Sequence, residues 1–203
     1  MTTLLIDTPH GDARAELHCC PEGRAALLLG HGAGGGTAAP DLVAATRAAV
    51  AAGVHVALVE QPYRVAGRRT PAPARQLDAA WLAVAEELAR GVCADLPQVF
   101  GGRSSGARVA CRTAADGDAA AVLCLAFPVH PPGRPDTTRV PELAAVDVPV
   151  LVVQGERDPF GRPEPAPGRE IVLLTGDHDL KADPEGVGRA VGEWLERRLR
   201  PLG

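Results

Sequence analysis

Short apolar runs alternate along the chain with longer segments in which apolar residues recur every three or four positions. Continuous short runs are typical of strands buried on both faces of a sheet. They predict strands at residues 3–7, 13–19, 25–30, 54–60, 98–102, 120–127, 148–155 and 170–176. The first two runs flank the turn-forming sequence PHGD, which predicts a hairpin.

The longer segments predict helices. These lie at residues 39–53, 71–91, 104–115 and 183–200, with at most a short helix at 141–146. In one of them, Leu77, Trp81, Val84 and Leu88 fall on a single helical face. Strands that alternate with helices form β-α-β units, whose strands run parallel. The pattern therefore predicts an α/β protein with a mostly parallel, doubly wound sheet and helices on both faces.

Composition narrows the class of protein further. A chain of 203 residues fits one domain spanning 1–203. The net charge of −4 gives no broad basic face for nucleic acid.

No signal-like segment is present, and no run approaches the roughly 18 apolar residues of a membrane span. The five cysteines lack metal-site spacing and suit a reducing compartment. We expect a soluble, cytoplasmic protein without a metal or organic cofactor; the sequence indicates no oligomeric state.

Serine is nearly absent, and its only two copies, Ser104 and Ser105, stand side by side in the sequence GGRSSGA. Ser104 has Gly102 and Gly106 two residues before and after it, which makes a G-x-S-x-G motif between a predicted strand and a predicted helix. The glycines allow a turn so sharp that side chains there would collide. A glycine-rich loop with an incidental serine is the alternative, but the absence of serine elsewhere favours Ser104 as a nucleophile.

A serine nucleophile needs a histidine that accepts its proton and an acid that orients the histidine. Asp158 and His178 each follow a predicted strand, at residues 148–155 and 170–176. Because the carboxyl ends of parallel strands meet at one sheet edge, both side chains are expected beside Ser104. The order serine, aspartate, histidine is also the one found in hydrolases built on such a sheet.

Other residues could fill the same roles. His130 also follows a strand and is the rival to His178 as the base. Glu156 and Asp177 are alternatives for the acid, but Glu156 is close to its strand and Asp177 adjoins the histidine in sequence. Asp158 and His178 therefore remain the preferred pair.

The sequence GHGAGGG at residues 30–36 follows a strand and supplies a further element. Acyl transfer needs two backbone N–H groups aimed at the developing oxyanion, and glycines let a loop approach that closely. We expect the N–H groups of Ser105 and of Ala33, or failing that Gly34, to form this oxyanion hole.

The same loop supports a competing hypothesis of dinucleotide binding. Gly30, Gly32 and Gly35 fit G-x-G-x-x-G, and Glu60 ends the next strand where a ribose-binding acid would stand. However, the following helix begins only near Pro40, and Glu60 lies 25 residues beyond Gly35. The hypothesis also leaves the serine, aspartate and histidine unexplained.

Residues after other strands could shape a substrate pocket. His31, Tyr63, Arg64, Arg103 and His130 are candidates. If the arginines converge, the site would favour an acyl group that carries a carboxylate or phosphate. The alternative is a set of solvated loops in an arginine-rich protein.

Several blocks together resemble a known family: LLLGHGAGGG, EQPYRVAGRR, FGGRSSGARVA, FPVHPPGRP, VQGERDPFG and GDHDLK. They are similar to the small, lid-free α/β-hydrolase-fold proteins related to dienelactone hydrolases, the testis-expressed-protein-thirty-like group, from about residue 24 to residue 195. The resemblance implies a minimal eight-stranded sheet with Ser104, Asp158 and His178 as a triad. True dienelactone hydrolases have a cysteine nucleophile, so their substrate is not carried over.

These observations predict a single-domain α/β-hydrolase fold without a cap domain, since the connection between strands 120–127 and 148–155 is short. The predicted activity is hydrolysis of a carboxylic ester or thioester of a small substrate, which would be anionic if the arginines converge, through an acyl-enzyme. The alternative is a catalytically silent scaffold of the same fold that binds a protein or a small ligand.

Overall fold

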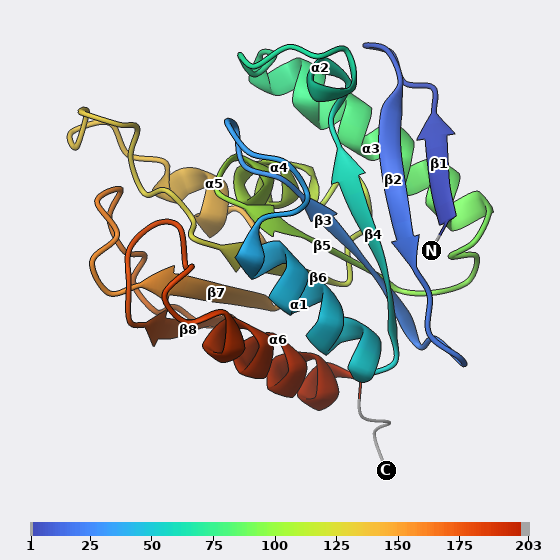
Figure 1. Cartoon of the computed structure of the whole chain (residues 1–203). Coiled ribbons are helices and arrows are strands. Elements are labelled where there is room, and N and C mark those ends of the chain that lie inside the picture. Colours follow the sequence, from blue (N-terminus) through green and yellow to red (C-terminus); the bar gives the residue numbers. More distant parts are fainter. Residues whose placement is uncertain (1, 200–203) are drawn as a thin grey trace.

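The computed structural model describes residues 2–199, which form one eight-stranded sheet with helices on both faces (Figure 1). The strands are β1 (Thr2–Ile6), β2 (Ala13–His18), β3 (Ala25–Gly30), β4 (Val54–Glu60), β5 (Gln98–Arg103), β6 (Ala121–Leu125), β7 (Val150–Gly155) and β8 (Arg169–Leu174). The helices are α1 (Pro40–Ala51), α2 (Pro62–Val65), α3 (Ala74–Arg90), α4 (Ser105–Thr113), α5 (Val140–Ala144) and α6 (Pro184–Arg198). Residues 1 and 200–203 of the predicted domain, with the predicted end of the last helix, lie outside the described residues.

The strand order is β1-β2-β4-β3-β5-β6-β7-β8. The hairpin of β1 and β2 is antiparallel, and β2 pairs antiparallel with β4. The six strands β3 to β8 run parallel to one another. This confirms the predicted mostly parallel, doubly wound sheet. In the sheet, β4 lies on one side of β3 and β5 lies on the other side. The order of strands therefore reverses at β3. Ligand sites of such sheets lie at this reversal, beyond the carboxyl ends of the strands.

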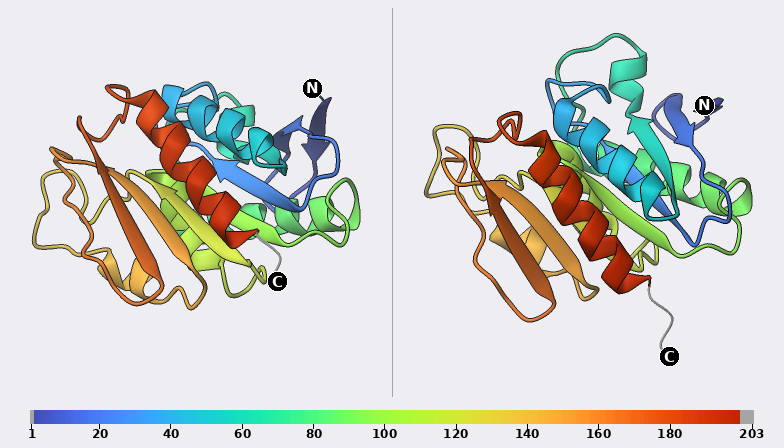
Figure 2. Two further views of the ribbon diagram at one scale, coloured as in Figure 1. Left: turned by 90° about the horizontal axis from the view of Figure 1, so that it is seen from below. Right: turned by 60° about the horizontal axis from the view of Figure 1, so that its bottom comes forward.

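The core consists of two apolar layers separated by the sheet. Leu27 and Leu29 of β3 pack with α1 and α6 on one face, where Trp194 is fully buried. Leu28 packs on the other face with α3 and α4, where Trp81 is fully buried. Figure 2 shows α1 and α6 side by side across their face of the sheet. Because successive strand residues point to opposite faces, a strand covered on both sides needs the continuous apolar run seen in the sequence.

Element boundaries differ from the prediction where single residues override the pattern. The short helix α2 was not predicted, since one turn of four residues has no apolar periodicity. Helix α3 begins at Ala74 rather than at residue 71, because Pro73 disfavours helical backbone at the residue before it. Strand β6 ends at Leu125, as Ala126 has a φ of 51° that extended backbone cannot adopt.

Within residues 2–199, no helix has both the length and the apolar content needed to cross a membrane.

Candidate active site

Ser104 occupies a strained turn between β5 and α4. Its φ of 52° and ψ of −105° are rare for a residue with a side chain. A Cβ atom on Gly102 would lie 2.6 Å from the carbonyl oxygen of Gly30, and one on Gly106 would also overlap that oxygen. Glycine is therefore required at both positions because the turn packs directly against the end of β3. This contact adds to the crowding within the turn itself that the sequence predicted.

Ser104, His178 and Asp158 form a continuous chain of hydrogen bonds. The Ser104 hydroxyl lies 2.8 Å from His178 Nε2, and His178 Nδ1 lies 2.8 Å from Asp158 Oδ2. An ionised carboxylate only accepts, so Nδ1 carries the proton and donates it to Asp158, and Nε2 is left to accept from the serine. The Asp158 side chain is fully buried and that of His178 is 14% exposed. The structure thus brings together the three residues that the sequence selected.

The Asp158 carboxylate is held by donors that the sequence analysis did not select. The backbone N–H of Phe160 donates to Oδ1 at 2.8 Å. Gln154 Nε2, fully buried in β7, donates to Oδ2 at 2.8 Å and lies 3.1 Å and 3.0 Å from the carbonyl oxygens of Phe127 and Gly161. A glutamine in an otherwise apolar strand was the available signal, since a buried polar side chain needs partners.

The His178 ring packs against an aromatic side chain as well. The Phe160 ring meets it edge-on, with centroids 4.5 Å apart and planes at 89°. This contact shields one side of the imidazole from water and restricts its rotation.

Arg103, predicted to bind substrate, is instead engaged with carboxylates around the site. Its guanidinium forms ion pairs with Asp41 at 3.0 Å and Asp179 at 2.8 Å, and it donates to the carbonyl oxygen of His178 at 3.3 Å. Asp41 is fully buried at the start of α1, where burial raises the pKa of its carboxyl and Arg103 partly opposes that shift. Arg103 therefore ties α1 and the histidine loop to the nucleophile turn.

Ala33 and Ser105 both line the hollow above Ser104, as the oxyanion-hole prediction requires. Among residues 2–199, neither backbone N–H donates a hydrogen bond within the protein. Ser105 is the first residue of α4, whose leading N–H groups have no partner within the helix. Tyr63 donates from its hydroxyl to the carbonyl oxygen of Ala33 at 2.9 Å, which fixes the loop that carries this amide.

His31 and Tyr63 are nearly completely buried and act within the protein rather than on its surface. His31 Nδ1 donates to Gly32 at 2.8 Å, and its Nε2 accepts from the Gln61 backbone at 3.1 Å. Burial lowers the pKa of His31, so the imidazole is neutral. Together with Tyr63, His31 joins the loop after β3 to the end of β4.

None of the five residues predicted to bind substrate lines the hollow. Arg64 is half-buried, and the Nδ1 of His130, the rival base, lies 3.1 Å from the carbonyl oxygen of its own neighbour Pro131. The hollow, of about 300 Å³, is instead walled by proline, alanine and leucine side chains, by Phe160, and by three arginines that were not singled out from the sequence: Arg108, Arg112 and Arg139.

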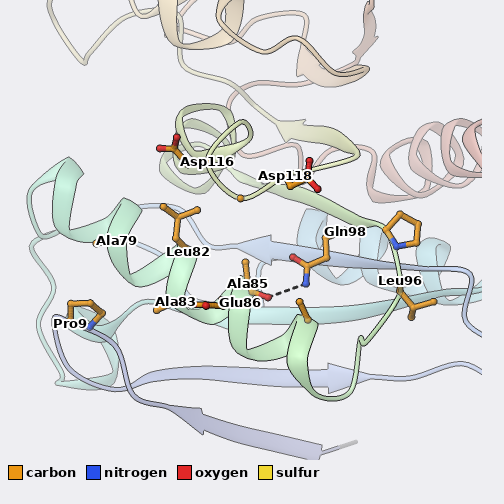
Figure 3. A pocket seen from close by; sticks show the side chains of 13 residues that line it. Pro9, Ala79, Leu82, Ala83, Ala85, Glu86, Leu96, Gln98, Asp116 and Asp118 are labelled. Atoms are coloured by element: carbon orange, nitrogen blue, oxygen red, sulfur yellow. Dashed lines mark hydrogen bonds between the residues drawn. The ribbon is translucent and has the colours of Figure 1, made fainter.

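A larger hollow of about 690 Å³ lies at the opposite end of β5, near Gln98, and no serine, cysteine or histidine lines it (Figure 3). Its wall is formed by α3 and the segment after α4, including Leu82, Asp116 and Asp118, and Gln98 donates to the Ala85 carbonyl across its floor at 3.0 Å. Among residues 2–199, no group of three or more histidine, cysteine or acidic side chains could hold a metal ion.

Comparison with known proteins agrees with this geometry. A family model described as an alpha/beta hydrolase domain matches residues 23–186. The chain belongs to this α/β-hydrolase family. The glycine loop after β3 is thus part of a hydrolase fold, and α1 begins only at Pro40, beyond those glycines. No curated protein sequence matches the chain significantly.

Solved structures with this fold include lid-free and esterase-type α/β-hydrolases. A serine hydrolase without a lid from Xanthomonas campestris is 20% identical, with a TM-score of 0.78 over 100% of this chain and 96% of that one. Est1E from Butyrivibrio proteoclasticus is 18% identical, with a TM-score of 0.79 over 98% and 99% of the two chains. A dienelactone hydrolase from Anabaena variabilis is 16% identical, with a TM-score of 0.78 over 98% of each chain.

Proposed function

We propose that this α/β-hydrolase cleaves a carboxylic ester or thioester of a small substrate, with Ser104 as the nucleophile. The observation that carries the proposal is the hydrogen-bonded series Ser104–His178–Asp158, with both contacts at 2.8 Å. Both distances are short enough for proton transfer through hydrogen bonds. The strained backbone of Ser104 also supports the proposal, because such strain is found mainly at functional sites.

The first half of the reaction forms an acyl-enzyme. The Ser104 oxygen attacks the carbonyl carbon while His178 Nε2 accepts the hydroxyl proton, and Asp158 stabilises the resulting imidazolium. The N–H groups of Ala33 and Ser105 donate to the oxyanion. When the tetrahedral intermediate collapses, the alcohol or thiol leaves with the proton from His178, and the acyl group remains on Ser104.

Water completes the cycle by the same roles in reverse. A water molecule attacks the acyl carbon as His178 accepts its proton. The second intermediate then releases the carboxylic acid, and the proton returns from His178 to the Ser104 oxygen.

The form of the hollow supports small substrates. It measures about 300 Å³, at the lower end of ligand pockets, and the segment between β6 and β7 contributes only α5 and loops rather than a cap domain. Three arginines and no acidic residue in its wall favour a substrate that carries a negative charge.

The alternative is a catalytically silent scaffold of the same fold, and steady-state kinetics distinguishes it from the proposed hydrolase. We expect wild-type protein to hydrolyse a short activated ester such as 4-nitrophenyl acetate. Ser104→Ala and His178→Ala should each lower kcat by about a thousandfold or more, as removal of triad members does. Ser105→Ala is the matched control, because its backbone N–H persists, and it should retain most of the activity. A folded wild-type protein with no activity on short esters and thioesters would favour the scaffold.

A further inference from the structure

Two arginines follow the nucleophile along one face of α4. Arg108 and Arg112 stand four and eight residues after Ser104, so they lie one and two helical turns beyond it on the same side. The Arg108 backbone N–H donates to the Ser104 carbonyl at 3.2 Å. Both side chains line the hollow above Ser104 and give its wall a cationic side.

These two guanidinium groups are already paired with carboxylates. Arg108 binds Glu142 through two contacts, of 2.5 Å and 2.8 Å. Arg112 binds Asp78 through contacts of 2.6 Å and 2.9 Å, and also lies 3.3 Å from Glu142. Burial tends to lower the pKa of Arg112, but the hydrogen bonds and negative charges of Asp78 and Glu142 together outweigh burial and raise the pKa. Asp78 and Glu142 therefore balance the charges of Arg108 and Arg112, although the two acids themselves do not line the hollow.

Arg139 adds a third cation that these acids do not neutralise. It is half-buried, just before α5, and its backbone N–H donates to the Val129 carbonyl at 2.7 Å. Within residues 2–199, no carboxylate lies within 4.0 Å of its guanidinium, and no hydrogen bond of that side chain is found. Burial and the neighbouring Arg108 lower the pKa of Arg139, and Glu142 opposes this only in part.

We propose that the hollow beside Ser104 is a carboxylate-binding subsite, with Arg139 as the residue that donates hydrogen bonds to a carboxylate on the substrate. The inference rests on the proposed esterase function and names its substrate class: small esters or thioesters that carry a free carboxylate a short chain away from the scissile carbonyl. A guanidinium offers parallel N–H donors that match a carboxylate in bidentate geometry. The apolar residues that also line the hollow, among them Leu77 and Phe160, suit the short hydrocarbon chain between the two groups.

A pair of nearly isosteric substrates tests the subsite. Monomethyl glutarate carries a carboxylate, and the methyl ester of glutaramic acid carries a neutral amide in its place. We expect wild-type protein to prefer the anionic ester in kcat/KM. Arg139→Gln should lower the ratio of anionic to neutral kcat/KM by about tenfold to a hundredfold, the size of one lost charge-assisted hydrogen bond. The change should appear mainly in KM for the anionic ester.

Two further variants make the comparison specific. Arg134→Gln removes an exposed arginine from the same segment and should leave the ratio unchanged. Arg139→Lys retains the charge without the planar fork and should restore part of the ratio. Thermal unfolding confirms that each variant is folded. If Arg139→Gln lowers kcat/KM for both esters equally, or if Arg134→Gln changes the ratio as strongly, the subsite is overturned while the esterase function stands.

Binding of glutarate, measured by calorimetry, separates this inference from the proposed function. If wild-type protein cleaves neither of these esters nor 4-nitrophenyl acetate but binds glutarate, and Arg139→Gln abolishes that binding, the subsite is supported and the esterase function fails. Wild-type protein that does not bind glutarate overturns the subsite. Inorganic phosphate is the comparison anion: binding of phosphate without glutarate would assign the arginines to a phosphate group and overturn the carboxylate proposal.

Discussion

At the scale of single residues, the site depends on side chains that never touch the substrate in the proposed reaction. Gln154 donates to the buried Asp158 carboxylate, and the Phe160 ring packs on His178. Such partners lock the geometry of the reacting groups, and what they contact is known only once the fold places them. The sequence predicted the serine, the acid and the histidine because each stands at a strand end. It did not indicate Gln154, which lies within a strand and gains its role through tertiary contact.

Replacement of Gln154 by leucine should weaken positioning without changing the substrate pocket. The variant loses the donor to Asp158 Oδ2 and leaves the Phe127 and Gly161 carbonyls without that partner. We expect kcat to fall about tenfold or more while KM stays within twofold, since a hydrogen bond to a charged group contributes about 1.5–3 kcal/mol. Steady-state kinetics on a neutral short ester checks this. A rise in KM with an unchanged kcat would show that Gln154 shapes the pocket instead.

At the scale of elements, the turn between β5 and α4 is determined by contact with β3. Ser104 has a positive φ, and Gly106 packs against the Gly30 carbonyl. The G-x-S-x-G spacing predicted the turn, although the predicted helix included Ser104 and α4 begins one residue later. The displacement follows from the strained conformation of Ser104, which a helical pattern does not reveal.

Two glycine-to-alanine substitutions separate helix propensity from this close contact. Alanine favours helices over glycine by about 1 kcal/mol. At Gly192 in α6 the new Cβ would lie 3.7 Å from the Ala48 Cβ, an ordinary contact, so Gly192→Ala should stabilise the protein by about 0.5–1 kcal/mol. At Gly106 the new Cβ would overlap the Gly30 carbonyl, so Gly106→Ala should destabilise it by about 2 kcal/mol or more and abolish most activity. Denaturant unfolding measures both, and equal stabilisation by the two substitutions would contradict the close packing.

At the scale of the whole molecule, ion pairs connect elements that are far apart in sequence. Arg103 at the end of β5 joins Asp41 of α1 to Asp179 in the loop after β8. The alternating pattern predicted the parallel sheet and the sheet edge at which the site lies. The pattern could not predict which arginines face the pocket, because side-chain direction depends on neighbours from distant segments. Arg103 forms ion pairs with acidic side chains, whereas Arg139 lines the hollow.

Loss of the Arg103 ion pairs should have a pH-dependent cost. Arg103→Met leaves Asp41 buried without its cation, and we expect the free energy of unfolding near neutral pH to fall by about 3 kcal/mol. Burial already raises the pKa of Asp41 above 3.8, and removal of Arg103 raises it further. In the window between 3.8 and the raised value, the folded state binds more protons than the unfolded state, so stability falls as pH rises through it. The deficit relative to wild type should therefore shrink as the pH is lowered. Urea unfolding at several pH values tests this, and a deficit independent of pH would assign the effect to packing.

The most direct test of the central claim is covalent labelling of the protein with a fluorophosphonate probe, followed by intact-mass measurement. Activation of Ser104 by His178 and Asp158 predicts a single adduct on wild-type protein, which Ser104→Ala and His178→Ala abolish and Ser105→Ala retains. Folded wild-type protein that forms no adduct, or an adduct that persists in Ser104→Ala, would contradict an activated Ser104 nucleophile.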